Sequence, residues 1–106
     1  MRIASVYVQN NLAGLLQETN EGTYVFTYMT GYQGSAVSLT MPSSQKKYTF
    51  TTFPPFFEGL LPEGGQLEGL LRREKIDGND YFSQLVTVGA DLVGDVTVQL
   101  LEEVPQ

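Results

Sequence analysis

The sequence contains no cysteine, no histidine and no tryptophan. Without cysteine, disulfide bonds and thiol catalysis are excluded, and a zinc site built from cysteine and histidine cannot form. Without histidine, the side chain most often used for general acid–base catalysis is missing as well. We therefore expect a protein that is not an enzyme and that uses no cofactor and no metal.

Positive charge is scarce, and long apolar runs are absent. Six basic residues face twelve acidic ones, which gives a formal net charge of −6. A nucleic-acid surface needs a concentrated basic face, but Arg72, Arg73 and Lys75 lie among acids such as Glu68 and Glu74. We expect no direct nucleic-acid partner.

No apolar run approaches the roughly 20 residues that a membrane helix needs. The first residues also lack the apolar core of a signal peptide. We therefore expect no membrane partner and a cytoplasmic location.

The composition is that of a small globular domain. The chain has 106 residues, of which 42% are hydrophobic, and six Tyr and six Phe supply large side chains for a core. This length fits one domain over residues 1–106.

The first half of the sequence has the pattern of strands. Residues 23–28 alternate, with Tyr24, Phe26 and Tyr28 on one face and smaller residues on the other. Large side chains at such spacing are more often core than binding surface. Strands are predicted at 2–8, 14–19, 23–28, 36–40 and 47–50, with turns at 9–14 and 20–22. The pattern favours an antiparallel meander with an aromatic inner face.

The second half has the pattern of helices followed by one strand. Pro54 and Pro55 predict an extended lead-in to a short helical turn at 56–61. A helix is predicted from about Gln66 to 75 and another at 81–86, with Asn79 or Asp80 as its cap. A turn at 89–94 and a strand at 95–101 follow. The predicted fold class is α+β: a small antiparallel sheet with two helices before a final strand.

The segment Gly59–Gly65, "GLLPEGG", is a poor start for a helix, because each glycine inside a helix costs about 1 kcal/mol relative to alanine. Interpreted as a loop, it offers Leu60 and Leu61 to a partner, with Pro62 limiting the entropy lost on binding. The alternative is that both leucines pack under the following helix. Glu58 and Glu63 could in principle form a hydrolytic carboxylate pair, but a solvated surface explains them better.

Two stretches carry a family resemblance. "FFEGLLPEG" (56–64) and "DYFSQLVTVGADLVGDVTV" (80–98) closely resemble the N-terminal subdomain of the HipA family of serine/threonine kinase toxins. "VYVQNNLAGLLQE" (6–18) and "TYVFTYMTGY" (23–32) fit the first strands of the same subdomain. The resemblance covers nearly the whole chain and implies that subdomain's fold. Because the sequence stops after "LLEEVPQ", with no kinase residues, it is similar to the stand-alone HipS antitoxins of three-component HipBST systems.

The resemblance implies partners and a site. The partners would be a HipT-like kinase toxin, which the antitoxin inhibits, and a DNA-binding HipB-like protein in a larger complex. The 59–66 loop would dock near the kinase active site. The partner-binding residues we predict are Phe57, Glu58, Leu60, Leu61, Pro62, Glu63, Gly64, Gly65 and Gln66.

The resemblance also leaves alternatives open. The chain could be a non-inhibitory module that bridges the kinase and the HipB-like protein, or an excised N-terminal subdomain of a HipA kinase. The starting methionine and the tail favour a complete protein. Relatives often carry an aromatic residue, commonly tryptophan, directly after "LLPEG", where this sequence has Gly65, either naturally or by an engineered change.

Overall fold

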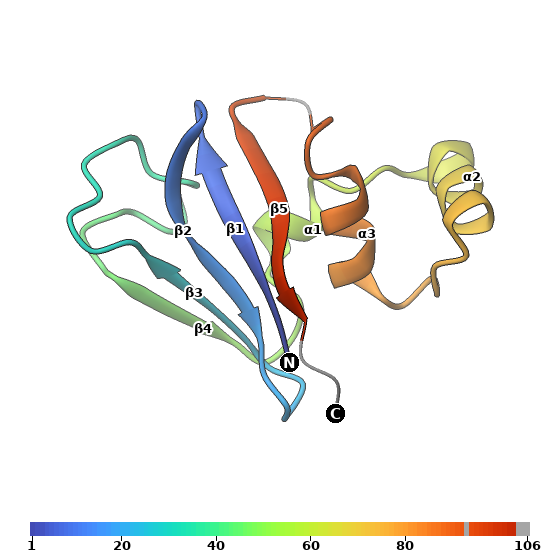
Figure 1. The fold of residues 1–106 in the computed structure, drawn as a ribbon, viewed down its shortest axis with the longest axis horizontal. Coiled ribbons are helices and arrows are strands. Elements are labelled where there is room, and N and C mark those ends of the chain that lie inside the picture. The colour runs from blue at the N-terminus through green and yellow to red at the C-terminus, as the bar shows by residue number, and fades with distance from the viewer. Residues whose placement is uncertain (93, 104–106) are drawn as a thin grey trace.

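A computed structural model describes residues 1–92 and 94–103 of the chain (Figure 1). It contains an antiparallel sheet and three helices, which confirms the predicted α+β class. The strands are β1 (Arg2–Val8), β2 (Asn11–Glu18), β3 (Tyr24–Tyr28), β4 (Lys47–Phe50) and β5 (Val96–Glu103). The helices are α1 (Pro55–Glu58), α2 (Gly64–Glu74) and α3 (Tyr81–Val88).

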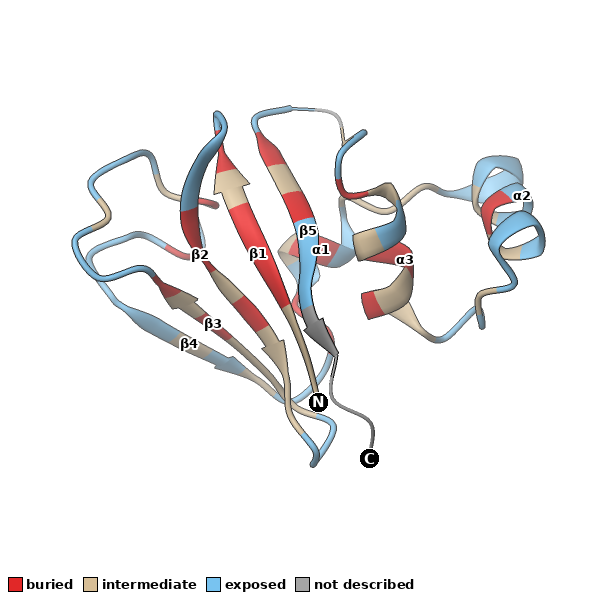
Figure 2. Cartoon of the chain, viewed as in Figure 1, coloured by how far each residue is buried: buried red, intermediate tan, exposed pale blue. Residues whose placement is uncertain are grey.

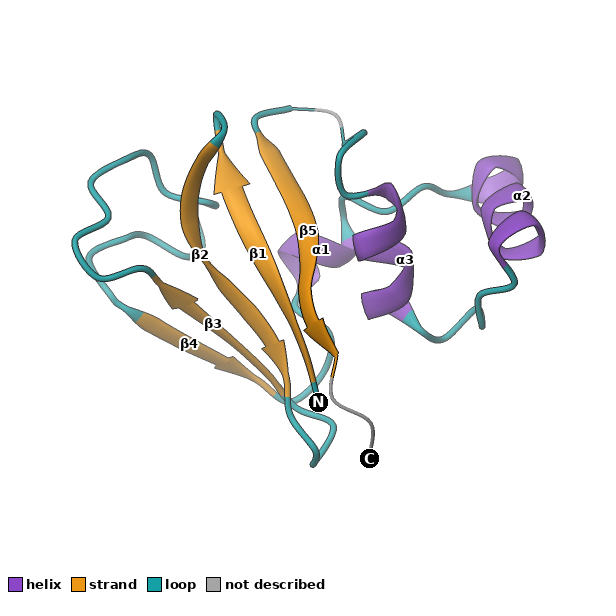
Figure 3. Cartoon of the chain, viewed as in Figure 1, coloured by secondary structure: helices purple, strands orange, loops and turns teal. Residues whose placement is uncertain are grey.

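The sheet has the strand order β4-β3-β2-β1-β5, and every neighbouring pair is antiparallel. The first four strands therefore form the predicted meander, and the last strand returns beside the first. Helices α1 and α3 lie close to the sheet, whereas α2 stands farther out (Figures 1 and 3). The three helices are inserted between β4 and β5.

The core lies between the sheet and the helices α1 and α3 (Figure 2). Phe26 from β3, Phe57 from α1 and Phe82 from α3 each have 0% of their surface exposed. Phe26 and Phe57 lie with their ring centroids 6.0 Å apart. Large aromatic side chains thus fill the core, as the composition predicts.

The predicted turn at 9–14 is wrong in extent. Only Gln9 and Asn10 form the turn, with φ values of 50° and 68°, and β2 already begins at Asn11. Two residues with positive φ between paired strands are the type I′ arrangement, whose twist matches that of the flanking strands. Leu12 and Ala13, which sequence reasoning placed in the turn, therefore belong to β2.

The predicted strand at 36–40 is also wrong. The structure has only an isolated bridge there, between Ser38 and Met41. The backbone N–H of Val37 donates to the Tyr28 hydroxyl (2.9 Å), and the Ser38 hydroxyl accepts from the N–H of Thr40 (3.1 Å). Side-chain oxygens thus accept hydrogen bonds that a neighbouring strand would otherwise accept.

The second helix begins earlier than predicted. Helix α2 starts at Gly64 rather than at about Gln66, so both glycines lie in its first turn. Gly64 has a φ of +59°, which glycine adopts without strain. The turn predicted at 89–94 includes Val93, which lies outside the described residues, as do residues 104–106 of the tail.

Candidate functional site

The loop after α1 is built on a buried phenylalanine. Pro54 caps α1 in an extended conformation and Pro55 opens the helix, as the lead-in of two prolines predicts. Phe57 anchors the helix in the core, and the N–H of Leu60 donates to its carbonyl (3.1 Å). The N–H of Leu61 donates to the Glu58 carbonyl (3.1 Å). These two bonds continue the helical turn and fix the direction in which the loop leaves the core.

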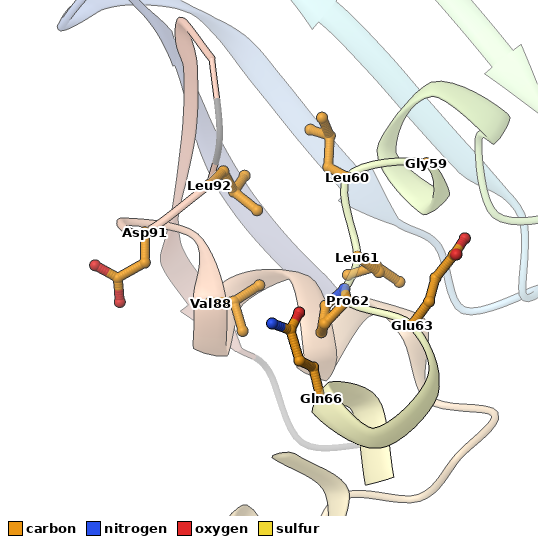
Figure 4. Close-up of a pocket in the computed structure, with 9 residues that line it drawn as sticks. All are labelled: Gly59, Leu60, Leu61, Pro62, Glu63, Gln66, Val88, Asp91 and Leu92. Carbon is orange, nitrogen blue, oxygen red and sulfur yellow. The ribbon is translucent and has the colours of Figure 1, made fainter. Parts of the chain in front are cut away.

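This loop forms one wall of a surface groove of about 610 Å³. Leu60, Leu61 and Pro62 come from the loop, and Val88 and Leu92 come from the end of α3 and the turn after it (Figure 4). The complete lining is Gly59, Leu60, Leu61, Pro62, Glu63, Gln66, Val88, Asp91 and Leu92. The groove therefore joins two segments that are about 30 positions apart in the sequence.

Five of the nine predicted site residues line the groove: Leu60, Leu61, Pro62, Glu63 and Gln66. Glu58, Gly64 and Gly65 are exposed beside it without lining it. Phe57 does not belong to the surface, because its side chain is fully buried. The predicted contact role of Phe57 is therefore wrong, because in sequence a buried anchor beside a proline looks the same as an exposed one.

Leu60 and Leu61 have both of the roles that the sequence offers as alternatives, core packing and exposure to a partner. Both are half-buried and pack against the core cluster, and both also line the groove. Because the core fixes these side chains in advance, little rotamer entropy remains to be lost when the groove is covered.

Sequence reasoning missed Val88, Asp91 and Leu92 as groove residues. Val88 and Leu92 are half-buried, and Asp91 is exposed. The available signal was the motif "GADL", which lies just after the apolar stripe of α3. Only the packing of α3 beside the 59–66 loop brings that motif to the site.

The groove carries negative charge and no positive charge. The carboxylates of Glu63 and Asp91 lie at opposite ends of the view in Figure 4, with Val88, Leu61 and Pro62 between them. An apolar floor with carboxylates at its margin suits an apolar side chain or short segment next to a basic group. Within residues 1–92 and 94–103, no group of three or more acidic residues is placed to hold a metal ion.

An ion-pair network holds the start of α3 and so helps to place its other end at the groove. Arg2 Nε donates to Glu18 Oε1 (2.7 Å), and Arg2 Nη2 donates to Asp80 Oδ1 (3.0 Å). The Arg2 guanidinium also lies 4.8 Å from the centre of the Phe82 ring. Asp80 is the N-cap of α3, since its carboxylate accepts from the N–H of Ser83 (3.1 Å). The predicted capping role of Asp80 is confirmed.

The pKa values of Arg2 and Asp80 shift in the directions that favour their charged forms. Hydrogen bonding to Glu18 raises the pKa of the Arg2 guanidinium further above its already high value. Burial alone would raise the pKa of the Asp80 carboxyl, but hydrogen bonds from Arg2 and Ser83 outweigh burial and lower it. Both groups are therefore charged at neutral pH.

Gly89 and Gln84 fix the rest of α3. The N–H of Val98 in β5 donates to the Gly89 carbonyl (3.0 Å), which ties the end of the helix to the sheet. Gln84 has 1% of its surface exposed, and its amide donates to the carbonyls of Asp77 (3.3 Å) and Gly78 (3.2 Å). The groove wall on α3 is therefore held at both ends of the helix.

Known proteins share this fold and much of this sequence. The family described as "HipA N-terminal domain" matches residues 4–99. A solved structure titled "N-terminal domain of HipA toxin" superposes with a TM-score of 0.77 at 29% identity, covering 98% of this chain and 96% of that one. An uncharacterized protein of Haemophilus influenzae strain Rd is 32% identical over 99 residues, which span 93% of this chain and 92% of that protein. None of the helices in the described part of the chain has the length and apolar character needed to cross a bilayer.

Proposed function

This chain belongs to the HipA N-terminal domain family, and we propose that it acts as a HipS-type antitoxin. In this role it binds a HipT-like serine/threonine kinase toxin through the groove beside the 59–66 loop and inhibits the kinase. The single observation that carries the proposal is the groove itself, a preformed apolar surface on a domain of this family. The partner complex would also contain a HipB-like DNA-binding protein.

The shape of the groove suits capture of a segment of the kinase. Leu60, Leu61 and Pro62 offer an apolar surface that the core already holds in place. Glu63, at the margin, is exposed and free to meet a basic group of the kinase. Inhibition then follows because the occupied segment, or the cleft next to it, cannot adopt the arrangement that phosphoryl transfer needs.

In this role the chain catalyses no reaction. Its contribution is binding free energy, which comes from covering the apolar floor and pairing the marginal carboxylates. Such an interface needs a few well-packed anchors rather than a large area.

The test uses the purified chain and a HipT-like kinase toxin from the same organism. We expect the chain to bind the kinase in isothermal titration calorimetry and to reduce its autophosphorylation. Coexpression is expected to restore the growth of cells that produce the kinase.

A matched pair of surface variants tests the site. The double variant Glu63→Ala with Gln66→Ala removes exposed groove side chains and is expected to weaken kinase binding by about fivefold to tenfold. The double variant Glu68→Ala with Arg72→Ala is the control. It changes exposed residues of α2 that do not line the groove and is expected to bind like the parent. Equal binding by all three chains would rule out the groove.

The alternative role, bridging the kinase to a HipB-like protein without inhibition, gives a different result in the same assays. In that case the chain binds the kinase, but phosphorylation continues until the third protein is added. The net charge of −6 suits a protein that associates with basic partners. Binding without inhibition would replace the antitoxin proposal with the bridging one.

A further inference from the structure

Leu39 is a large apolar side chain that the fold presents to solvent without cover. It is 100% exposed, more than any other large apolar side chain in the described residues. It lies at the tip of the turn from Ser38 to Met41, far along the chain from the groove. Single exposed apolar residues are common, so the surroundings of Leu39 decide whether it has a role.

The turn that carries Leu39 is held rigidly on both sides. Val37 and Met41, which flank it, are 5% and 2% exposed. The hydroxyl of Tyr28 accepts from the N–H of Val37 (2.9 Å) and donates to the carbonyl of Met41. The N–H of Met41 also donates to the Ser38 carbonyl (3.1 Å). Leu39 is thus presented on a fixed backbone, which lowers the entropy cost of binding through it.

Leu39 stands at an apolar hollow that adjoins α1. The hollow has a volume of about 570 Å³ and is lined by Ser35, Ala36, Val37, Ser38, Leu39 and Phe56. Phe56 belongs to α1, and Gly59 and Leu60, just after the same four-residue helix, line the groove. Residues of α1 and of the segment directly after it therefore contribute to both the hollow and the groove.

The charged residues of the chain segment that carries Leu39 are all positive, whereas those that line the groove are all negative. All twelve acidic residues of the chain lie outside residues 22–57, and the only charged residues inside that range are Lys46 and Lys47. Both lysines are exposed, and Lys46 Nζ donates to the Thr30 hydroxyl (3.0 Å). The backbone N–H of Tyr28, whose hydroxyl holds the Leu39 turn, also donates to the Lys46 carbonyl (2.8 Å), which ties the lysine segment to that turn. An apolar projection on a segment whose charged residues are both lysines is complementary to an apolar pocket bordered by carboxylates.

We infer that Leu39 is a second anchor for the protein partner and inserts into an apolar pocket that is bordered by acidic residues. This inference rests on the proposed function, since it assigns the partner to the same kinase that covers the groove. Two contacts of opposite charge fix the orientation of the partner, which a single groove would leave less defined.

The test compares three variants in calorimetric titrations against the HipT-like kinase. Leu39→Ser is expected to weaken binding at least tenfold, because a leucine side chain that the complex buries is exchanged for a small polar one. The fold of this variant should be unaffected, since the Leu39 side chain is fully exposed in the free chain. Leu101→Ser is the control, because Leu101 is 57% exposed and lines neither the hollow nor the groove.

The third variant, Lys46→Glu with Lys47→Glu, tests the acidic border. It is expected to weaken binding severalfold at low salt and less at high salt. Binding by Leu39→Ser within twofold of the parent, while Glu63→Ala with Gln66→Ala loses affinity, overturns the second anchor and leaves the proposed function standing. Unchanged or tighter binding by the charge-reversed variant contradicts the inference that acidic residues border the pocket. If the parent chain does not bind the kinase, both the proposed function and the role of Leu39 as a second anchor are wrong.

Discussion

Gly89 follows α3 directly, at a point where the backbone lies against β5. A Cβ atom at this position would lie 1.9 Å from the carbonyl oxygen of Val98, which is backbone and cannot rotate away. Gly89→Ala is therefore expected to push α3 from the sheet and to lower the free energy of unfolding by about 2–3 kcal/mol. Urea unfolding followed by circular dichroism measures this change.

Gly69 in α2 is the matched control for that substitution. A Cβ atom at Gly69 would meet no atom within 4 Å, and the position is exposed inside a helix. Gly69→Ala is expected to raise the free energy of unfolding by up to about 1 kcal/mol. If both substitutions had the same effect, the close approach of Gly89 to β5 would not be what fixes glycine there.

Asp80 makes the stability of the chain depend on acid pH. Its folded-state pKa is lowered, because the hydrogen bonds from Arg2 and Ser83 outweigh the opposing effect of burial. A lowered folded pKa contributes stability above the ordinary carboxyl value of 3.8. This contribution is lost as the pH falls from that value through the lower folded value. Asp80→Asn is expected to flatten the decline of stability below about pH 4.

The measurement for Asp80 is thermal unfolding between about pH 2.5 and pH 7, a range that spans the carboxyl titration. Asp95→Asn serves as the control, since Asp95 is exposed and its side chain has no ion-pair partner among the described residues. The parent and Asp95→Asn should lose stability together as the pH falls. If the stability of Asp80→Asn fell with pH in the same way as that of the parent, the Asp80–Arg2 ion pair would contribute nothing to the pH dependence of stability.

The elements differ in how well the sequence predicts them, and hydrogen-bond partners explain the difference. β1, β3, β4 and α3 follow from alternation, apolar stripes and caps, which are local properties. The predicted strand at 36–40 failed because its polar backbone groups bond to the Tyr28 hydroxyl and to Ser38. A tyrosine nine positions away gives no local signal, so this loop could not be predicted from its own residues.

The candidate site was predictable on one side only. The loop wall carries an unusual local sequence, so Leu60, Leu61 and Pro62 could be singled out. The α3 wall, Val88 and Leu92, looks like ordinary helix and turn sequence, and only the packing of α3 makes it a wall. The sequence does not distinguish Phe57 from a surface residue, because its burial depends on tertiary packing.

The backbone at Gly64 sets the angle at which α2 leaves the loop. Gly64 has a φ of +59° and Gly65 has an ordinary one, and a Cβ atom added at either position would meet nothing within 4 Å. Gly64→Ala is therefore expected to cost about 1–2 kcal/mol, whereas Gly65→Ala should be neutral or slightly stabilising. Urea unfolding distinguishes the two, and equal effects would show that the left-handed conformation is not required.

The open space at Gly65 also makes a larger side chain possible there. The family resemblance places an aromatic residue, commonly tryptophan, at this position. Gly65→Trp is expected to fold like the parent, because a Cβ there meets nothing within 4 Å. It is also expected to inhibit the HipT-like kinase more strongly, by about tenfold or more, if an aromatic ring adds buried area to the contact. A kinase assay with the two chains decides this, and equal inhibition would mean that the position does not touch the kinase.

The whole molecule is uneven in how firmly its parts are held. The central strands β1 and β2 pair on both edges, and their inner residues are buried, whereas α2 stands apart from the sheet (Figure 1). Only Leu70 of α2 is buried, and left-handed residues, Gly64 and Lys75, bound the helix. Segments with few buried contacts open locally at a lower free energy than the whole fold.

Amide hydrogen exchange of the free chain should therefore separate two groups. The amides of β1 are expected to exchange only through global unfolding, and those of α2 orders of magnitude faster through local opening. Addition of the HipT-like kinase should slow exchange in residues 60–67, and in residues 37–41 if Leu39 also contacts it. Glu68→Ala with Arg72→Ala should leave that protection unchanged. Equal protection of α2 and β1 in the free chain would show that α2 is held by more than the burial of Leu70.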